Sequence, residues 1–386
     1  MIVRFVAPPF IGALVLLVCF GCGGISETPG ASSEAGPVAA PGTVAFYPPV
    51  PLVPVGDRLA SDNLVQNGGF EQPITGGAGQ GIPWWTVSAP GAVSVGLAED
   101  VVADGRYALR IDLNADEAVS ATQQVQLPAG ELFVLRGLLY AKDLRGSLIV
   151  SGRGGDLVET DVQQAARAVL EVDGAQDAWW LGQCEFLSPK STVRMADVTV
   201  RFGYFPGAGV SGPGALYLDG VELYRLSTTQ CVTNGDFESA TDVGKVGTWS
   251  DDEFILRSEN AFEGRYALEL AQNPGKETML TGVIVNGESL RGKRVWLSAM
   301  VEAPGAGSAA DKTVTLRTRF LVNGQRHYES VTHPGGAGYV ELNLTVTVPN
   351  DLGPDVNPFT LELLRGRGVE GPVLIDNVSV LTKAAP

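Results

Sequence analysis

The hexapeptide NGGFEQ at Asn67–Gln72 is almost the same as the hexapeptide NGDFES at Asn234–Ser239, far along the same chain. Similar phrases follow each copy in the same order. These are GRYAL, which begins at Gly105 and Gly264, and LDGV or IDNV, which begins at Leu218 and Ile375. Ordered similarity of this kind indicates that one domain is present twice. Each copy spans roughly 150 to 165 residues, which is enough to bury a core of its own.

The residues before the first repeat have the pattern of an export signal. Arg4 precedes an apolar run from Ile11 to Phe20, which is too short for a comfortable membrane span. The run ends in Gly21-Cys22, which resembles the end of a bacterial lipoprotein signal, with Cys22 as the lipidated residue. A cleaved signal without lipid and an uncleaved anchor remain alternatives. A lipid anchor in the membrane would place the protein in the bacterial cell envelope, at the outer membrane or the cell surface.

These features divide the chain into four parts. Residues 1–22 are the predicted lipoprotein signal peptide, and residues 23–61, which are rich in Pro, Gly and Ser, are a predicted flexible linker. The first module is expected at 62–226 and the second at 230–383. The linker ends in YPPVPLVPVG, which favours extended polyproline geometry and would hold the folded part away from a membrane.

The charge of the chain argues against nucleic acid as a partner. The formal net charge is -16, and no run of residues is rich in Lys or Arg. Nucleic acid binding depends on a basic surface that neutralises phosphates. We therefore expect no nucleic-acid partner.

The pattern of apolar residues predicts an all-β fold. Segments such as STVRMADVTVRFGYF and KTVTLRTRFLV alternate apolar and polar residues, and Gly and Pro separate them. No stretch sustains a long amphipathic helical pattern with caps at both ends. We predict two tandem antiparallel β-sandwich domains of the jelly-roll type.

Each repeat contains five motifs in the same order: N-G-x-F-E, a tryptophan, G-x-x-A-L, a late aromatic residue and a closing L/I-D-N/G-V. In this order the motifs resemble those of the carbohydrate-binding modules grouped as families four, nine and twenty-two. The resemblance covers Asn63–Leu226 and Cys231–Lys383. It implies a galactose-binding-like jelly roll in each repeat and non-catalytic binding of polysaccharide or a cell-surface glycan. Because the same sandwich serves many functions, a structural or protein-interaction envelope lipoprotein is the alternative.

The resemblance also implies a structural calcium ion in each module. Its ligands would include the opening glutamate and the closing aspartate of each repeat, namely Glu71 with Asp219 and Glu238 with Asp376. Calcium takes several hard oxygen ligands at once, and two carboxylates from opposite ends of a domain would join its termini. The alternative is that these acids cap turns or face water.

Sugar recognition requires an aromatic ring with polar groups beside it. Aligning ELFVLRGLLYA (131–141) with KRVWLSAMVEA (293–303) places Trp296 on the non-core face of its strand, and Arg136 and Tyr140 on the equivalent face of the first repeat. Arg317 and Arg319 alternate with apolar residues and are predicted to line the same outer sheet as Trp296. Burial of Trp296 under a loop or against the other domain remains the alternative. The predicted ligand-binding residues are Trp296, Arg317, Arg319, Trp84, Tyr140 and Arg136.

No catalytic motif accompanies the repeats. The chain contains no nucleophile elbow, no HExxH motif and no phosphate loop. The two histidines, His327 and His333, do not have the spacing of a familiar zinc pair. We therefore expect no enzymatic activity. In an exported protein Cys184 and Cys231 can pair as a disulfide, or they are two separate small apolar residues.

Overall fold

The computed structural model describes residues 45–46, 63–72, 82–89, 92–114, 118–152, 167–174, 178–207, 213–239, 249, 255–273, 275–284, 287–353 and 359–384. The predicted signal peptide, Cys22 and nearly all of the predicted linker lie outside these residues. Residues Pro41–Pro386 form one compact unit. In the described ranges the regular elements are strands and two short 3-10 helices, η2 (Gly287–Leu290) and η3 (Ala310–Lys312). No helix in these ranges is long and apolar enough to cross a membrane.

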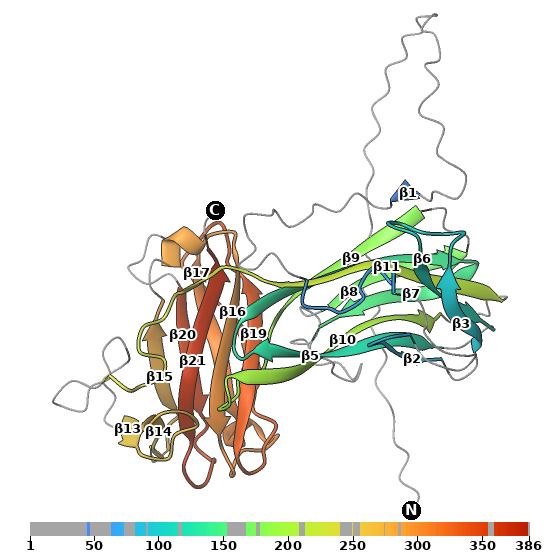
Figure 1. The fold of residues 1–386 in the computed structure, drawn as a ribbon. Coiled ribbons are helices and arrows are strands. Elements are labelled where there is room, and N and C mark those ends of the chain that lie inside the picture. The colour runs from blue at the N-terminus through green and yellow to red at the C-terminus, as the bar shows by residue number, and fades with distance from the viewer. Residues whose placement is uncertain are drawn as a thin grey trace, which may run out of the picture. The chain divides into compact units, whose positions relative to one another are not determined.

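The first sandwich is built from two sheets (Figure 1). The strand order of its six-stranded sheet is β1-β9-β6-β11-β4-β3, and that of its five-stranded sheet is β2-β5-β10-β7-β8. The six-stranded sheet contains β1 (Ala45–Phe46), β3 (Ala92–Ala98), β4 (Ala108–Leu113), β6 (Leu132–Lys142), β9 (Ala178–Leu187) and β11 (Gly214–Arg225). The five-stranded sheet contains β2 (Thr86–Ser88), β5 (Val119–Pro128), β7 (Leu144–Ser151), β8 (Arg167–Gly174) and β10 (Met195–Pro206).

The second sandwich also has two sheets. One has the order β13-β14-β21-β16-β19, with β12 paired to β21, and the four-stranded sheet has the order β15-β20-β17-β18. The larger sheet contains β12 (Thr228–Gln230), β13 (Ile255–Ser258), β14 (Ala267–Leu270), β16 (Arg294–Glu302), β19 (Tyr339–Thr347) and β21 (Leu374–Lys383). The four-stranded sheet contains β15 (Thr278–Val283), β17 (Val314–Val322), β18 (Gln325–Thr332) and β20 (Phe359–Arg365).

The two sandwiches repeat one topology. The order β9-β6-β11-β4-β3 corresponds to β19-β16-β21-β14-β13, and β5-β10-β7-β8 corresponds to β15-β20-β17-β18. Among the described strands every pairing is antiparallel except that of β1 with β9. The prediction of an all-β chain with two antiparallel jelly-roll sandwiches is confirmed. β1 comes from the segment predicted as a linker, so part of that segment pairs with the first sandwich.

The repeated hexapeptide places its phenylalanine in the core of each sandwich. Phe70 and Phe237 are fully buried, and both have a left-handed backbone, with φ of 57° and 55°. The ring of Phe70 lies 5.5 Å from that of Trp85, and the ring of Phe237 lies 5.2 Å from that of Trp249. Aromatic pairs at this separation anchor the first turn of each sandwich to its core.

The second residue of the hexapeptide must be small because it lies against the closing strand. The Val221 amide donates to the Gly68 carbonyl over 2.9 Å, and the Val378 amide donates to the Gly235 carbonyl over 2.7 Å. A Cβ at Gly68 or Gly235 would collide with the carbonyl oxygen of Val221 or Val378. The phrase occurs twice because each sandwich needs this close backbone approach.

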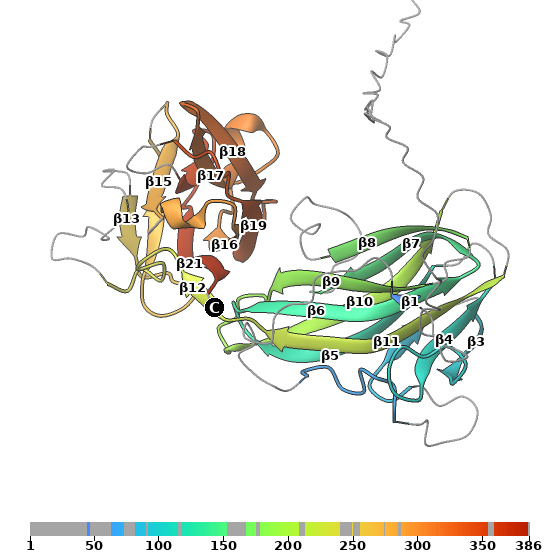
Figure 2. The same ribbon diagram turned by 90° about the horizontal axis from the view of Figure 1, so that it is seen from above.

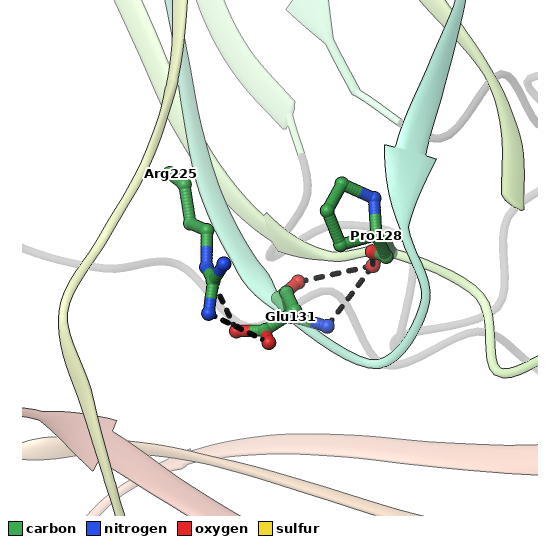
Figure 3. A network of polar contacts seen from close by, with 4 residues as sticks. Pro128, Glu131 and Arg225 are labelled. Carbon is green, nitrogen blue, oxygen red and sulfur yellow. Dashed lines mark hydrogen bonds and ion pairs between the residues drawn. The ribbon is translucent and has the colours of Figure 1, made fainter. Parts of the chain in front are cut away.

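A polar network fixes the turn between β5 and β6 to the end of β11 (Figure 3). Arg225 donates to both carboxylate oxygens of Glu131, over 2.8 Å from Nη2 and 3.1 Å from Nε. Ser188 Oγ accepts the Glu131 amide at 3.0 Å and donates to the Pro128 carbonyl at 2.6 Å. The bidentate arginine–carboxylate pair gives this end of the first sandwich a fixed geometry.

The two cysteines of the described chain are buried and free, so no disulfide joins them. Burial raises the pKa of the Cys184 thiol to about 12. A thiol in this state is protonated and unreactive at neutral pH. Cys184 and Cys231 are therefore small apolar core residues.

Candidate functional site

The four-stranded sheet turns one face toward the core and the other away from it. On β17 the side chains of Val314, Leu316 and Phe320 are buried in the core, and Arg317 and Arg319 lie on the opposite face. This is the alternation that the sequence predicted. We call this opposite surface the four-stranded face. The register of the sheet also places seven residues of the neighbouring strands on the four-stranded face: Met279 and Thr281 of β15, Thr360, Glu362 and Leu364 of β20, and Arg326 and Tyr328 of β18.

Glu362 lies at the centre of the four-stranded face. It is opposite Arg317 of β17 on one side and Thr281 of β15 on the other. The residue is only 1% exposed. Its carboxylate pairs with Arg317 Nε at 2.6 Å and with Arg319 Nε at 3.5 Å. The two guanidinium groups offset the cost of burying this charge.

Tyr328 presents an aromatic ring beside these charges. It lies on the edge strand β18, opposite Arg319, and is 43% exposed. The guanidinium carbon of Arg317 is 4.5 Å from the centre of the Tyr328 ring, so Arg317 is held by both the ring and Glu362. Met279, on the opposite edge strand β15, is 37% exposed. Figure 2 labels β15, β17 and β18 in the second sandwich.

The four-stranded face therefore combines apolar and hydrogen-bonding groups. An aromatic ring can stack on the apolar side of a pyranose, while guanidinium and carboxylate groups bond its hydroxyls. Sequence reasoning missed Glu362 and Tyr328. The only sequence signal for Glu362 was a charged residue between two leucines of a buried strand. The exposure of Tyr328 depends on β18 being an edge strand, which the sequence pattern does not indicate.

Trp296 does not lie on the four-stranded face. It is in β16, which belongs to the other sheet of the second sandwich, so the prediction that it shares an outer sheet with the arginines of β17 is wrong. Trp296 is 3% exposed. Its buried neighbours are Leu132, Val134, Tyr224 and Leu226. Burial, the alternative that the sequence left open, is the arrangement found, and it leaves no ring face for stacking on a sugar.

Arg136 and Tyr140 are also buried, on β6 of the six-stranded sheet. Arg136 pairs with Glu222, and its guanidinium carbon lies 5.5 Å from the centre of the Tyr224 ring. The ring of Tyr140 lies 5.6 Å from that of Tyr217. Both of these predicted ligand-binding residues are therefore occupied by neighbours within the protein.

The first sandwich has its own outer face, on the five-stranded sheet. Arg201 of β10 lies near its centre, opposite Thr122 of β5 and Ser151 of β7, and donates to Ser120 Oγ over 3.5 Å. We call this surface the five-stranded face. Trp84, two residues before the edge strand β2, is 52% exposed and has a φ of 67°. Of the predicted aromatic ligand-binding residues it is the one with an open ring.

The predicted calcium ligands Glu71 and Asp219 hold one loop of the first sandwich. Glu71 Oε1 accepts two amide hydrogen bonds of 2.7 and 2.9 Å, and Asp219 Oδ2 accepts two of 2.9 and 3.0 Å. We call this arrangement the carboxylate clamp. The donors are the amides of Arg106 and Tyr107 to Glu71 and of Ala103 and Asp104 to Asp219.

The second sandwich contains the same clamp. Glu238 Oε1 accepts two amide hydrogen bonds of 2.7 Å, and Asp376 Oδ2 accepts two of 2.8 and 3.0 Å. The donors are the amides of Arg265 and Tyr266 to Glu238 and of Phe262 and Glu263 to Asp376. In each sandwich the opening and closing motifs of the repeat therefore meet at the GRYAL loop.

The buried aspartates of the clamps have unusual acidity. Burial raises the pKa of Asp219 and of Asp376 to about 6, against the opposing effect of the backbone amides. In the described part of the chain no Lys or Arg pairs with Glu71 or Asp219, and Glu71 Oε2 is not used by the amide bonds. No group of three or more His, Cys, Asp or Glu that could hold a metal is present there. Asp219 Oδ1 accepts the Gly220 amide at 2.6 Å, so in the described chain Glu71 Oε2 is the carboxylate oxygen of this clamp that accepts no amide, and it is the one that a hard cation would use.

Comparison with known proteins gives structural likenesses only. No family model matches the chain, and no curated protein matches it. The tandem domain CBM22-1-CBM22-2 from Paenibacillus barcinonensis Xyn10C is 14% identical, with a TM-score of 0.30, over 85% of this chain and 100% of that one. "Family 16 Carbohydrate Binding Module-2" is 14% identical, with a TM-score of 0.31, over 39% and 98%. TmCBM61 in complex with β-1,4-galactotriose is 21% identical, with a TM-score of 0.28, over 43% and 99%. The solved structures to which this chain is similar include carbohydrate-binding modules of several families, an α-L-arabinofuranosidase and a bacteriophage tailspike protein.

Proposed function

We propose that this protein binds polysaccharide through the four-stranded face of its second sandwich and does not cleave it. The observation that carries the proposal is the exposed ring of Tyr328 beside the Arg317–Glu362–Arg319 cluster. Such a face offers a stacking surface and guanidinium donors for sugar hydroxyls. The similar solved structures include carbohydrate-binding modules, which is in keeping with this function.

The chemistry of the four-stranded face supports binding without hydrolysis. Glycoside hydrolysis uses two carboxyl groups on opposite sides of the scissile bond. Among the described outward positions of this face, Glu362 is the one acid, and two arginines pair with it. A buried carboxylate paired in this way serves to hold the two arginines in place, and no second acid faces it among the described outward positions of the sheet.

Attachment to the cell envelope and calcium binding complete the proposed function. The signal-like sequence ending in Cys22 supports a lipid anchor in the membrane, from which the linker would extend the two modules toward a glycan. The two carboxylate clamps support one structural calcium ion for each module, held by Glu71 with Asp219 and by Glu238 with Asp376. A bound calcium ion would supply positive charge that joins the two ends of each module.

The test is the affinity of the full-length protein for an array of polysaccharides, with Tyr328→Ala beside the wild type. We expect the variant to lose about fivefold in affinity, because a stacking ring is worth on the order of 1 kcal/mol. The matched control is His327→Ala, since His327 is the exposed neighbour that points to the other side of β18. Thermal unfolding checks that both variants are folded.

Two outcomes would count against this function. Equal binding by the wild type and Tyr328→Ala would remove the four-stranded face as the site. No binding of any polysaccharide by the folded protein would instead favour the alternative, an envelope lipoprotein that uses the same fold for structure or protein interaction.

A further inference from the structure

We propose that the four-stranded face selects polysaccharides that carry carboxylate groups, as polymers containing uronic acids do. This inference rests on the proposed function, because it names the class of glycan that the same face binds. Three features of the face support it: its local charge, the orientation of its arginines and the ring beside them.

Positive charge is in excess on this face. Its described outward positions carry Arg317, Arg319 and Arg326, against the single carboxylate of Glu362. Glu277, which is exposed, precedes β15 at one edge of the sheet. The chain as a whole has a net charge of -16, so the excess is local. Salt screens distant charges beyond about 8 Å, and the charges of the face itself therefore decide what binds there.

The two central arginines keep a second edge for a ligand. Arg317 and Arg319 both meet Glu362 through Nε. A guanidinium can bind a carboxylate through its end edge, which is formed by the two Nη atoms, and this edge is left when the internal pair uses Nε. No hydrogen bond within the described chain uses the Nη atoms of these two residues, and both side chains are partly exposed.

The position of the Tyr328 ring next to the arginines favours a carboxylated sugar over a free anion as the ligand. Tyr328 is the cross-strand partner of Arg319 and holds the guanidinium of Arg317 against its face. A pyranose stacked on the exposed part of this ring would place its substituents next to the arginines. A carboxylate substituent would then gain charge-assisted hydrogen bonds that a hydroxymethyl group at the same position cannot form.

The experiment compares polymers that differ only in charge. Binding of the full-length protein is measured to polygalacturonate and to glucuronoxylan, each beside the same polymer after its carboxylates have been reduced to alcohols. We expect the acid form of at least one polymer to bind about tenfold more tightly than its reduced form, because a charge-assisted bond is worth roughly 1.5 kcal/mol or more. The preference should shrink when sodium chloride is raised from about 50 to about 500 mM.

Arg319→Met removes the charge and keeps the apolar stem of the side chain. This variant should bind the acid form about tenfold more weakly and the reduced form as before. Arg367→Met is the matched control, because Arg367 is exposed in the turn after β20 and is not part of a strand of this face. Dextran sulfate serves as a polyanion without carboxylates.

The outcomes separate this inference from the proposed function. Equal affinity for the acid and reduced forms would overturn the selectivity while leaving polysaccharide binding in place. Equal affinity for dextran sulfate, unaffected by Arg319→Met, would show general charge attraction and would also overturn it. Failure to bind any of these polymers, or any polysaccharide on the array, would remove the proposed function and the selectivity together.

Discussion

The two sandwiches are the same at their carboxylate clamps and different on their outer faces. In both clamps the opening glutamate and the closing aspartate accept two amides each from the same loop. The outer faces share only the strand order beneath them. The clamp has little freedom because its hydrogen bonds go to the backbone and require particular carboxylates at particular places. An outer face has no such requirement, so it can change with the ligand.

The charges of the two outer faces show this difference. On the five-stranded face the register places Arg145, Arg167 and Arg201 at outward positions against Glu171, Asp173 and Asp197, which balance. The outward positions of the four-stranded face carry three arginines and one glutamate, and two of these arginines pair with that glutamate. The two modules therefore share one fold but have different outer faces. We expect any preference for acidic glycans to belong to the second module.

The largest expected effect comes from breaking one clamp at a time. Asp376→Ala leaves the amides of Phe262, Glu263 and Asn377 without their acceptor. Since unpaired buried donors cost about 1 to 3 kcal/mol each, we expect the second sandwich to lose about 3 kcal/mol of its free energy of unfolding. Asp219→Ala should do the same to the first sandwich. Amide hydrogen exchange, read separately for each sandwich, measures both losses.

If the two clamps are equivalent, Asp219→Ala and Asp376→Ala should cause equal losses in the free energy of unfolding of their own sandwiches. Asp197→Ala is the control, since Asp197 is exposed on β10 and takes no part in either clamp. It should change the stability of neither sandwich by more than about 0.5 kcal/mol. If Asp219→Ala and Asp376→Ala differed by more than about 2 kcal/mol, the two clamps would not be equivalent in energy, whatever their geometry.

A smaller effect is expected from pH, because the pKa values of Asp219 and Asp376 are about 6 in the folded protein against 3.8 for an ordinary aspartate. The folded state therefore binds more protons than the unfolded state between these two values. The free energy of unfolding should fall as pH rises from about 4 to about 6, by on the order of 2 kcal/mol for each group. Urea unfolding at a series of pH values in EDTA measures this slope.

Calcium should change the sign of that slope. A divalent cation binds the ionised carboxylate, so its stabilising effect grows as Asp219 and Asp376 lose their protons. The double variant Asp219→Asn with Asp376→Asn cannot titrate at these positions and should show a flatter profile with or without calcium. A wild-type profile that is the same in calcium and in EDTA would argue against the proposed calcium sites.

The fold could be predicted from the sequence because the repeated motifs mark the same structural positions in both sandwiches. The twice-written NGGFEQ and NGDFES phrases, their phenylalanines and the closing aspartates all have backbone roles that the structure repeats in both sandwiches. The alternation on β17 was also sufficient to place Arg317 and Arg319 on an outer face. Such local patterns depend on period and spacing, which a sequence displays directly.

The remaining residues of the site could not be predicted from the sequence, because their positions depend on which strands belong to the same sheet. Trp296 and Arg317 both lie on the non-core face of a strand, and alternation alone cannot tell that β16 and β17 belong to different sheets. For the same reason Arg136 and Tyr140 resembled ligand-binding residues, although neighbouring side chains bury them. Glu362 and Tyr328 join the arginines of β17 only through the register of β20 and β18.

The smallest expected effect is at Trp84, and it tests whether the first module binds at all. Its ring is exposed, so Trp84→Ala should change the free energy of unfolding by less than about 0.5 kcal/mol. A weak second site on the same chain adds avidity on a repetitive glycan, and we therefore expect about a threefold loss of apparent affinity for a long polymer. A short oligosaccharide cannot reach two modules at once. We therefore expect Trp84→Ala to leave the affinity of the four-stranded face for such an oligosaccharide unchanged. Isothermal titration of both ligands, with Tyr328→Ala beside it, measures the difference. A loss as large as that of Tyr328→Ala would make the two outer faces equal partners, and no loss on the long polymer would leave binding to the second module alone.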